Sequence, residues 1–371
     1  MKILQTPVRF YPFTGGVENY VYNLSRELVK MDHEVKVICA NEPPSDEFER
    51  VDGINVNRIP YYFKIANTNL TPSLPWAMRK FKYDIIHTHL PTPWTADWSA
   101  FYSRIKGKPL VLNYYNDIVG NGAAHYIAQL YNKTCLKLLL NQAERIIIIQ
   151  ENYLDYSPYL ADYEDKIRVV PVGVDVNRFK PLEIEEEGNS IFFLSLLDEF
   201  HKYKGLEYLL NAIKIVKEDI KDVKLVVGGK GSLLEYYKSM AESLGIHDNV
   251  EFHGFISEEK IVEYYNHCSL FVLPSISSAQ EGFGIVALEA LACKKPVLTT
   301  DIVGIAQDLQ ETGSGKVVPK KDPEALASAI LEILQDDHRY KMGEKGRKLV
   351  EDKYTWEIVA KLTDKVYKEI L

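Results

Sequence analysis

The sequence predicts an α/β protein made of two doubly wound domains, each with a parallel sheet. Three observations lead to this prediction. The chain of 371 residues is long for a single hydrophobic core. Short apolar runs alternate with segments of helical periodicity in both halves, which is the βαβ rhythm of parallel sheets. In addition, residues 269–293 have the pattern of a buried strand, a Ser- and Gly-rich turn and a helix.

Composition and charge narrow the class of protein. The composition is that of a globular protein, without an apolar run that could span a bilayer or an apolar signal-peptide core at the start. The four cysteines (Cys39, Cys135, Cys268 and Cys293) lack metal or redox spacing, so we expect reduced thiols in a cytoplasmic protein. The net charge of −8 argues against a nucleic-acid partner.

The first elements suggest a phosphate site. A strand over Lys2 to Gln5 leads into a loop with Gly15 and Gly16, then a helix over Val17 to Met31, whose apolar residues share one face. A glycine turn that feeds a helix after the first strand suits a phosphate group. The loop lacks the Gly-x-Gly-x-x-Gly pattern, which disfavours a dinucleotide. An ordinary turn is the alternative.

Polar residues end the next two strands, predicted over Asp84 to His89 and Pro109 to Asn113. Ligands of doubly wound sheets bind at the carboxyl ends of strands. Alternation places His87 and His89 on the same side of their strand, and Tyr115 follows the neighbouring strand. We expect these side chains to face one crevice. Packed, hydrogen-bonded histidines are the alternative.

The second half repeats the pattern after an acidic run, Glu183 to Glu187, which predicts a solvated linker. A strand over Ile191 to Leu197 is followed by Lys204-Gly205, which opens a helix over Leu206 to Lys217. Further strands and helices alternate up to a last helix near Trp356 to Ile370.

The stretch from Leu273 to Ala292 carries the chemistry. Glu281 lies in its loop, and Glu289 is almost alone among apolar residues of the predicted helix, Ile285 to Cys293. A carboxylate on an apolar helix is costly to bury unless it is hydrogen-bonded, and a helix N-terminus suits an anion. Two carboxylates beside an anion site suggest a sugar nucleotide. A satisfied core Glu289 with a solvated Glu281 is the alternative.

This stretch resembles the Glu-x7-Glu signature of the retaining glycosyltransferases of family 4, which have the GT-B fold. The match includes Pro-Ser before Glu281, Gly-Phe-Gly after it and Glu-Ala-Leu-Ala from Glu289. The Gly-Gly-Val-Glu from Gly15 is similar to the family's first loop. The resemblance implies two Rossmann-like domains with a central cleft. It places an acceptor-side domain at 1–180, a nucleotide-sugar domain at 181–353, and a helix at 354–371 that crosses back to the first.

The resemblance also assigns roles to residues. Glu281 matches the carboxylate that meets the donor sugar, Glu289 the one that binds the ribose, and Lys204 the phosphate lysine. The diphosphate would be cradled by backbone groups of Gly15, Gly16, Gly282, Phe283, Gly284 and Ile285.

The implied activity is transfer of a hexose, with retention, from a UDP- or GDP-linked sugar to a glycan or glycolipid acceptor. No metal or other cofactor is expected, because cationic side chains and helix dipoles can stabilise the departing nucleoside diphosphate. Two alternatives remain open: a UDP-sugar epimerase, and a catalytically silent sugar-nucleotide-binding module.

Three positions depart from the family pattern. Leu196 stands where the family usually has an arginine, and His201 or Lys202 is a candidate replacement. Tyr115 stands in place of the family's common histidine and cannot carry its positive charge. Lys294 replaces a small glycine, which we interpret as surface variation.

A last segment predicts a membrane partner. Pro75 to Tyr83 mixes cations with aromatic residues, and Tyr61 to Phe63 lies nearby. Such a segment suits an anionic membrane surface, here the inner face of the cell membrane. Burial of these aromatic residues in the core is the alternative.

Overall fold

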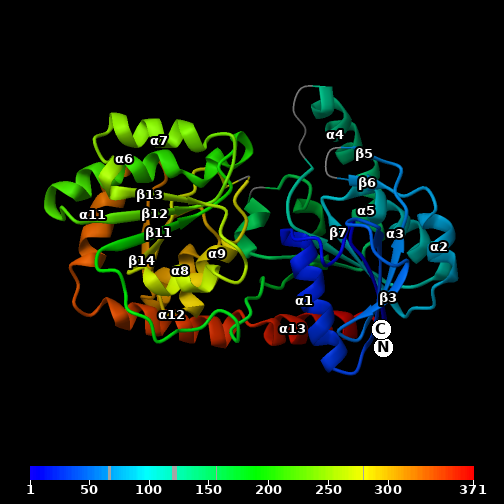
Figure 1. The fold of residues 1–371 in the computed structure, drawn as a ribbon. Coiled ribbons are helices and arrows are strands. Elements are labelled where there is room, and N and C mark those ends of the chain that lie inside the picture. The colour runs from blue at the N-terminus through cyan, green and yellow to red at the C-terminus, as the bar shows by residue number, and fades with distance from the viewer. Residues whose placement is uncertain (66–67, 119–122, 156, 279) are drawn as a thin grey trace. The chain divides into compact units, whose positions relative to one another are not determined.

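The computed structural model describes residues 1–65, 68–118, 123–155, 157–278 and 280–371. They form two compact units, shown in Figure 1. Unit 1 comprises residues 1–173 together with 356–371, and unit 2 comprises residues 174–355. The C-terminal segment therefore belongs to unit 1, although the whole of unit 2 separates it in sequence from the rest of that unit.

Unit 1 is built on an eight-stranded sheet in the order β10-β9-β8-β7-β1-β2-β4-β3, as far as the described residues go. All neighbours are parallel except the edge pair β3 and β4. A separate antiparallel ribbon joins β5 to β6. The strands are β1 (Lys2–Thr6), β2 (Glu34–Ala40), β3 (Phe48–Val51), β4 (Ile54–Ile59), β5 (Phe63–Ile65), β6 (Thr68–Leu70), β7 (Ile85–Leu90), β8 (Leu110–Tyr114), β9 (Arg145–Ile148) and β10 (Ile167–Val169).

Helices cover both faces of this sheet. They are α1 (Gly16–Lys30), α2 (Leu74–Lys80), α3 (Pro93–Lys106), α4 (Ala123–Lys133), α5 (Cys135–Gln142) and α13 (Trp356–Lys368), with 3-10 turns η1 (Glu151–Asp155) and η2 (Ala161–Lys166). Leu4, Ile86 and Leu112 share one apolar core with residues of α2, α3 and α5. Successive strand residues point to opposite faces, so Gln5 and His87 face the other side, where α1 and α13 pack together.

The described residues of unit 2 form a six-stranded, all-parallel sheet in the order β13-β12-β11-β14-β15-β16. Counted along the chain this is 3-2-1-4-5-6, the strand order of the Rossmann fold, and the order reverses between β11 and β14. The strands are β11 (Ser190–Leu194), β12 (Lys224–Gly228), β13 (Val250–Gly254), β14 (Leu270–Leu273), β15 (Val297–Thr300) and β16 (Gly315–Val318). The helices are η3 (Glu199–Lys204), α6 (Leu206–Asp219), α7 (Leu234–Ser243), η4 (His247–Asn249), α8 (Ile261–His267), α9 (Ile285–Ala292), α10 (Ala306–Thr312), α11 (Pro323–Leu334) and α12 (Arg339–Lys353).

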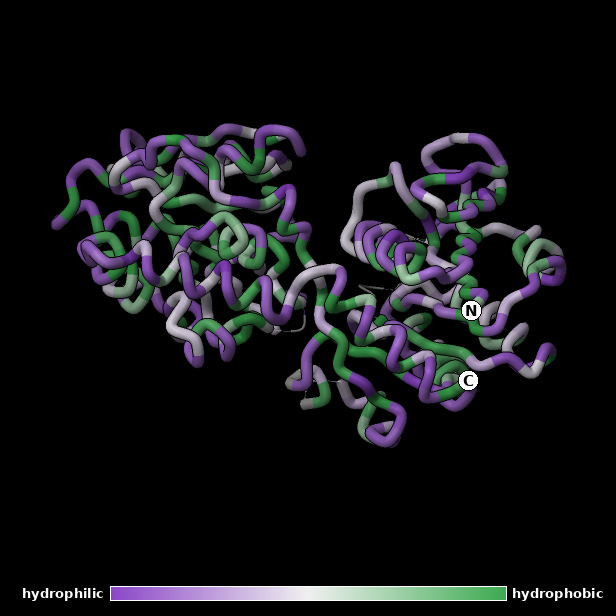
Figure 2. Tube along the Cα trace, turned by 90° about the horizontal axis from the view of Figure 1, so that it is seen from below, coloured by the Kyte–Doolittle hydropathy of each residue, from purple (hydrophilic) through white to green (hydrophobic). Residues whose placement is uncertain are grey.

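Apolar segments in both units run through the strands and the helix faces that pack on them, and hydrophilic segments form most of the loops (Figure 2). Within the described ranges, no helix is both long and apolar enough to cross a membrane.

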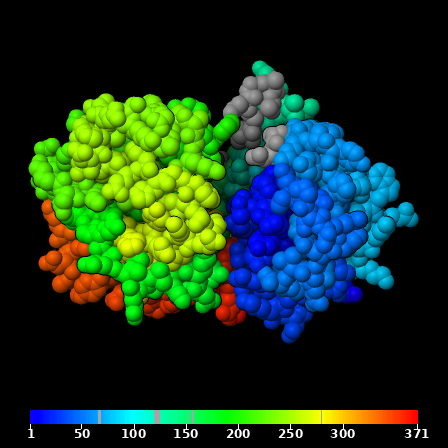
Figure 3. All heavy atoms as spheres, in the orientation of Figure 1, coloured from blue at the N-terminus to red at the C-terminus, as the bar shows by residue number. Residues whose placement is uncertain are grey.

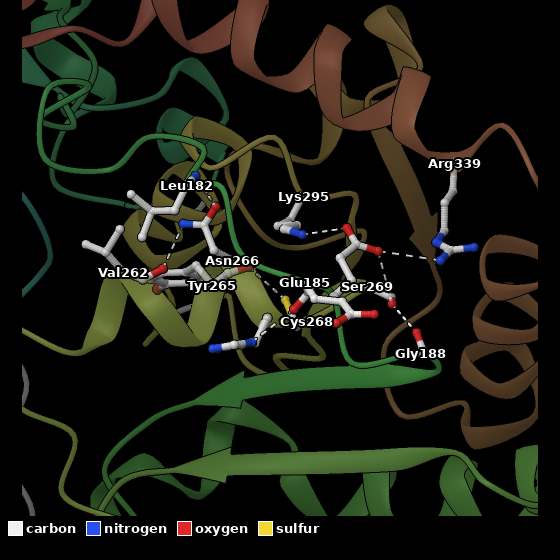
Figure 4. Close-up of polar contacts among 12 residues, drawn as sticks. Leu182, Glu185, Gly188, Val262, Tyr265, Asn266, Cys268, Ser269, Lys295 and Arg339 are labelled. Atoms are coloured by element: carbon white, nitrogen blue, oxygen red, sulfur yellow. Dashed lines mark hydrogen bonds and ion pairs between the residues drawn. The ribbon is translucent and has the colours of Figure 1, made fainter.

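The acidic run that we expected to be a solvated linker is instead fastened to unit 2 (Figure 4). The Glu186 carboxylate contacts Lys295 Nζ at 2.5 Å and Arg339 Nη2 at 3.5 Å. Asn266 Oδ1 accepts a hydrogen bond from the Leu182 backbone N–H at 2.8 Å. The glutamate side chains remain exposed, but cations and polar groups brought near by folding anchor the segment. The charge pattern alone could not reveal those partners.

A close backbone approach shapes the start of α6. Gly205 has φ +78°, and a Cβ placed on it would lie 2.0 Å from the carbonyl oxygen of Pro274. Only glycine allows this contact. It carries Lys204 next to the loop that follows β14.

We predict that Gly205→Ala destabilises unit 2 more than Gly245→Ala does. Gly245 has a similar φ of +71° but open space around its Cβ position, so its substitution should cost only the left-handed strain of about 1–2 kcal/mol. Gly205→Ala should cost roughly 1–3 kcal/mol more because of overpacking. Denaturant unfolding of both variants measures the difference. Equal losses would contradict the close approach.

Candidate functional site

Two charged residues meet where the strand order of unit 2 reverses. Lys204 follows β11, and Glu281 follows β14. Lys204 Nζ donates to both carboxylate oxygens of Glu281, at 3.0 Å and 2.8 Å, and the Ser275 hydroxyl donates to the same carboxylate. The Glu281 side chain is 3% exposed and that of Lys204 16%. The structure thus brings two of the predicted site residues into one largely buried ion pair.

Lys204 keeps its positive charge in this setting. Burial alone would lower the pKa of its ammonium group, but the Glu281 carboxylate and the Tyr203 phenol outweigh burial and raise the pKa above its usual value. The ammonium group therefore stays charged throughout the neutral pH range.

Hydrogen bonds from the neighbouring strand hold the loop around Glu281. The hydroxyls of Thr299 and Thr300 donate to the carbonyl oxygens of Leu273 and Ser275, at 2.9 Å and 2.6 Å. The loop ends at Gly284, whose φ of +85° starts α9.

The predicted phosphate cradle surrounds this turn. Phe283 is buried with its ring 5.1 Å from that of Tyr354, whereas Gly282 is half-buried and Ile285 exposed. The first backbone N–H groups of a helix have no partner inside the helix. In α9 the N–H groups of Ala287 and Leu288 donate to the carbonyl oxygen of Gly284, so those of Ile285 and Val286 are left available to an anion.

Glu289 lies further along α9 with a partner of its own. The Tyr265 hydroxyl, on a wholly buried ring, donates to Glu289 Oε2 at 2.6 Å. Burial raises the pKa of Glu289 to about 7, and the bond from Tyr265 offsets only part of that rise. The carboxyl group is thus hydrogen-bonded through one oxygen, and its other oxygen can still accept.

The two candidate replacements for the missing arginine are engaged locally. His201 Nδ1 lies 2.7 Å from Asp198 Oδ1, and Lys202 Nζ lies 3.0 Å from Glu199 Oε2. Leu196 itself is 48% exposed. Neither His201 nor Lys202 is therefore an uncompensated cation.

A lysine that the sequence analysis passed over lies beside Leu196. Gly229 and Gly231 pack so closely on the 195–197 backbone that Cβ atoms there would lie 1.7 Å from Ser195 O and 2.1 Å from Leu197 O. Between them, Lys230 accepts a hydrogen bond from Leu197 N at 3.0 Å and exposes its side chain. The Gly-Gly-Lys-Gly sequence after a strand was the available signal.

In unit 1, the polar strand ends form a buried network. His87 Nε2 lies 2.6 Å from Asn113 Oδ1, and His89 Nε2 lies 2.9 Å from Gln5 Oε1. An amide oxygen only accepts, so both Nε2 atoms carry hydrogen and both Nδ1 atoms accept. Tyr367 of α13 donates to His87 Nδ1 at 2.7 Å.

Both histidines are fully buried. Burial lowers the pKa of His87 to about 4 and that of His89 well below its usual value, so both rings are neutral. They are packed, hydrogen-bonded histidines, the alternative considered above, and not exposed groups.

Tyr115 joins this network from its edge. Its hydroxyl donates to His89 Nδ1 at 3.1 Å, and the two rings stack with centroids 6.0 Å apart. Burial raises the pKa of the Tyr115 phenol, so it stays protonated. Because its only proton is directed to His89, the oxygen is left to accept a further hydrogen bond, not to donate one.

The two glycines at the start of α1 differ in their surroundings. A Cβ on Gly15 would lie 2.3 Å from Glu18 Oε2, whereas one on Gly16 would meet nothing within 4 Å. The Glu18 carboxylate is paired with Arg9 at 3.0 Å and lies in the first turn of the helix, where the helix dipole favours an anion. At Gly15 the contact would be with the end of a flexible side chain, and Gly16 faces open space.

Nowhere in the described ranges do three or more His, Cys, Asp or Glu side chains gather so that they could hold a metal ion.

Family models place this architecture in a known class. The model described as glycosyl transferases group 1 matches residues 177–349, and that of glycosyltransferase family 4 matches residues 14–178. Together they span nearly the whole chain, with a changeover close to the boundary between the two units. The chain belongs to glycosyltransferase family 4 and has the GT-B fold.

Individual relatives agree along the full length. An uncharacterized glycosyltransferase of Methanocaldococcus jannaschii is 26% identical over 403 residues, covering 99% of this chain and 98% of its own. The O-antigen chain mannosyltransferase C of Escherichia coli is 28% identical over 370 residues, covering 96% and 95%. The crystal structure of Anabaena HepE in complex with UDP covers 100% of both chains, with a TM-score of 0.77 at 17% identity, which shows the common fold.

The neutral histidine network predicts a loss of stability in acid. The folded-state pKa of His87, about 4, lies below the unfolded value of about 6.5. The unfolded chain then binds more protons between these values, so stability is complete above about pH 6.5 and falls toward pH 4, by up to roughly 3 kcal/mol.

Thermal unfolding of wild type, His87→Gln and His247→Gln between pH 7.5 and 4.5 tests this expectation. His87→Gln should flatten the decline, and the exposed His247→Gln should leave it unchanged. A His87→Gln profile parallel to that of wild type would contradict the neutral assignment.

Proposed function

We propose that this protein transfers a hexose, with retention of anomeric configuration, from a UDP- or GDP-linked sugar to an acceptor carried by a glycan or a lipid. It would work in the cytoplasm, with an anionic membrane surface as a partner, and without a metal ion. The observation that carries the proposal is the Lys204–Glu281 pair at the reversal of strand order, beside the N-terminus of α9. Ligands of such sheets bind at that point.

The residues of unit 2 can meet each part of such a donor. Lys204 and the first amides of α9 would stabilise the negative charge that develops on the departing diphosphate. Glu281 has acceptor capacity beyond its bond to Lys204 and would receive hydroxyls of the donor sugar. Glu289 would receive those of the ribose through its free oxygen. Lys230 would supply the cation absent at Leu196.

Unit 1 would help to orient the sugar-nucleotide donor. The Tyr115 oxygen would accept a hydrogen bond from a sugar hydroxyl, since its proton is held by His89. Gly16, with open space at its Cβ position, leaves room for a phosphate to approach the start of α1.

The relatives support the donor and acceptor classes. The Anabaena protein is described in complex with UDP, and the E. coli relative is named as a mannosyltransferase of the O-antigen chain.

A panel of UDP- and GDP-linked hexoses tests the function. With a suitable glycan or lipid acceptor, one donor should yield free nucleoside diphosphate and a product with retained configuration, and EDTA should leave the rate unchanged. Lys204→Ala should abolish turnover, whereas the matched Lys202→Ala should keep it. An epimerised donor without diphosphate release would indicate the epimerase. Tight binding without either reaction would indicate a silent module.

The Glu289 role makes a separate prediction. Glu289→Gln keeps an acceptor for the Tyr265 hydroxyl but removes the charge, and should weaken nucleoside diphosphate binding by about 2 kcal/mol. Because the pKa of Glu289 is raised to about 7, wild-type affinity should also fall from pH 8 to pH 6, and more steeply than that of the variant, in which only the terminal phosphate of the ligand titrates in this range.

Calorimetric titration measures both effects, with Tyr265→Phe as the control for the shared hydrogen bond. Glu289→Ala is the less suitable variant, because it would leave the buried Tyr265 hydroxyl without its acceptor at a cost of about 1–3 kcal/mol of stability. If Glu289→Gln bound nucleoside diphosphate with wild-type affinity at every pH, Glu289 would not belong to the binding site.

A further inference from the structure

Large apolar side chains gather on the outer side of one helical layer of unit 1. This layer, which we call the outer layer, consists of α2, α3, α4 and α5 with the β5–β6 ribbon. The exposed fraction of its large apolar residues ranges from 48% at Phe101 to 75% at Tyr62. They are Tyr62, Phe63, Ile65, Trp76, Phe101, Ile105, Tyr126, Ile127, Leu130 and Leu138.

The elements of the outer layer are contiguous. α3 packs on β7 and is flanked by α2, β6 and α5, and α4 packs on α5. The buried residues of α2, α3 and α5 face the sheet, so their exposed residues lie on the side away from it. The β5–β6 ribbon and α2 can be followed on the surface of unit 1 in Figure 3 by their light blue and cyan atoms.

The same stretch of chain is strongly basic. Residues 61–142 contain nine Lys and Arg but only three Asp and Glu, in a protein whose net charge is −8. The three acids are turned toward protein groups: Asp84 accepts from the Lys2 backbone N–H, Asp97 from the Tyr131 hydroxyl, and Asp117 from the Tyr114 and Ser157 hydroxyls.

Most of the basic side chains are left uncompensated. Lys64 pairs with Glu42, and Lys106 donates to three carbonyl groups at the end of α2. In the described part of the chain, the other seven have no ion pair: Arg79, Lys80, Lys82, Arg104, Lys108, Lys133 and Lys137. Lysines of unit 2 such as Lys221 and Lys238 instead pair with neighbouring glutamates.

We propose that the outer layer docks on the surface of an anionic lipid bilayer, with its apolar side chains in the interface and its cations at the lipid phosphates. We favour an anionic bilayer as the partner because its negative charge is complementary to the cations of the outer layer. A second copy would bring unpaired cations against each other, and lysine is depleted in protein interfaces. The centre of the surface is on α3, α4 and α5, well beyond the segment from Pro75 to Tyr83 that the sequence suggested.

Vesicle binding of the full chain, without sugar nucleotide, tests the docking apart from the proposed function. Binding should be found with vesicles that contain phosphatidylglycerol, be weak with phosphatidylcholine alone, and fall with added salt. Each cation near the surface contributes about 1 kcal/mol, or about fivefold. Lys133→Gln combined with Lys137→Gln should therefore lower partitioning about twenty-five-fold.

Matched controls come from unit 2. Lys221→Gln with Lys238→Gln should leave binding unchanged. Ile127→Ser with Leu130→Ser should weaken binding even in high salt, and Tyr340→Ser, also exposed, should not. All variants should keep wild-type nucleoside diphosphate affinity.

Three results would overturn the docking: no vesicle binding at low salt, equal binding to neutral vesicles, or equal losses in the test and control variants. A dimer in sedimentation that Ile127→Ser with Leu130→Ser dissociates would assign the surface to a second copy instead. Failure of sugar transfer with intact vesicle binding would count against the proposed function alone.

Discussion

The buried contact between Lys204 and Glu281 requires that two loops, 77 residues apart in sequence, be held at hydrogen-bonding distance. Two opposite charges out of water are stable only when geometry and further hydrogen bonds compensate for lost hydration. The structure supplies these through Ser275, the threonines of β15 and the glycine at position 205, which lets two backbones touch. The rest of the site in unit 2 depends on this constraint, because the same loop continues into α9.

The two units carry different kinds of side chain at the point where the strand order of each sheet reverses. Unit 2 places charges there, whereas unit 1 fills the ends of β1, β7 and β8 with neutral rings and amides. Their pH dependence has opposite signs. Acid must charge His87 and so destabilises unit 1, but it neutralises Glu289, whose raised pKa means that the folded state holds a proton more readily than the unfolded state does.

Local patterns could be predicted from the sequence, and partners could not. Helix α9 was expected over Ile285 to Cys293, and in the structure it ends one residue earlier. This helix could be predicted because its apolar run and the glycine before it are properties of the segment itself. The Tyr265 partner of Glu289, the Tyr367 partner of His87 and the Lys295 partner of Glu186 all come from distant segments. Strand order and helix packing decide such contacts, and periodicity carries no information about either.

Tyr115, at a position where the family resemblance implies a histidine, shows how this matters for chemistry. From residue type alone, a phenol could donate to a sugar, but the network commits its proton to His89 and leaves an acceptor. An acceptor can orient a hydroxyl, yet it adds no positive charge near a departing phosphate. On the proposed function, the stabilising charge must then come from unit 2, where Lys204 stays protonated and Lys230 has an exposed side chain over the ring of Phe255.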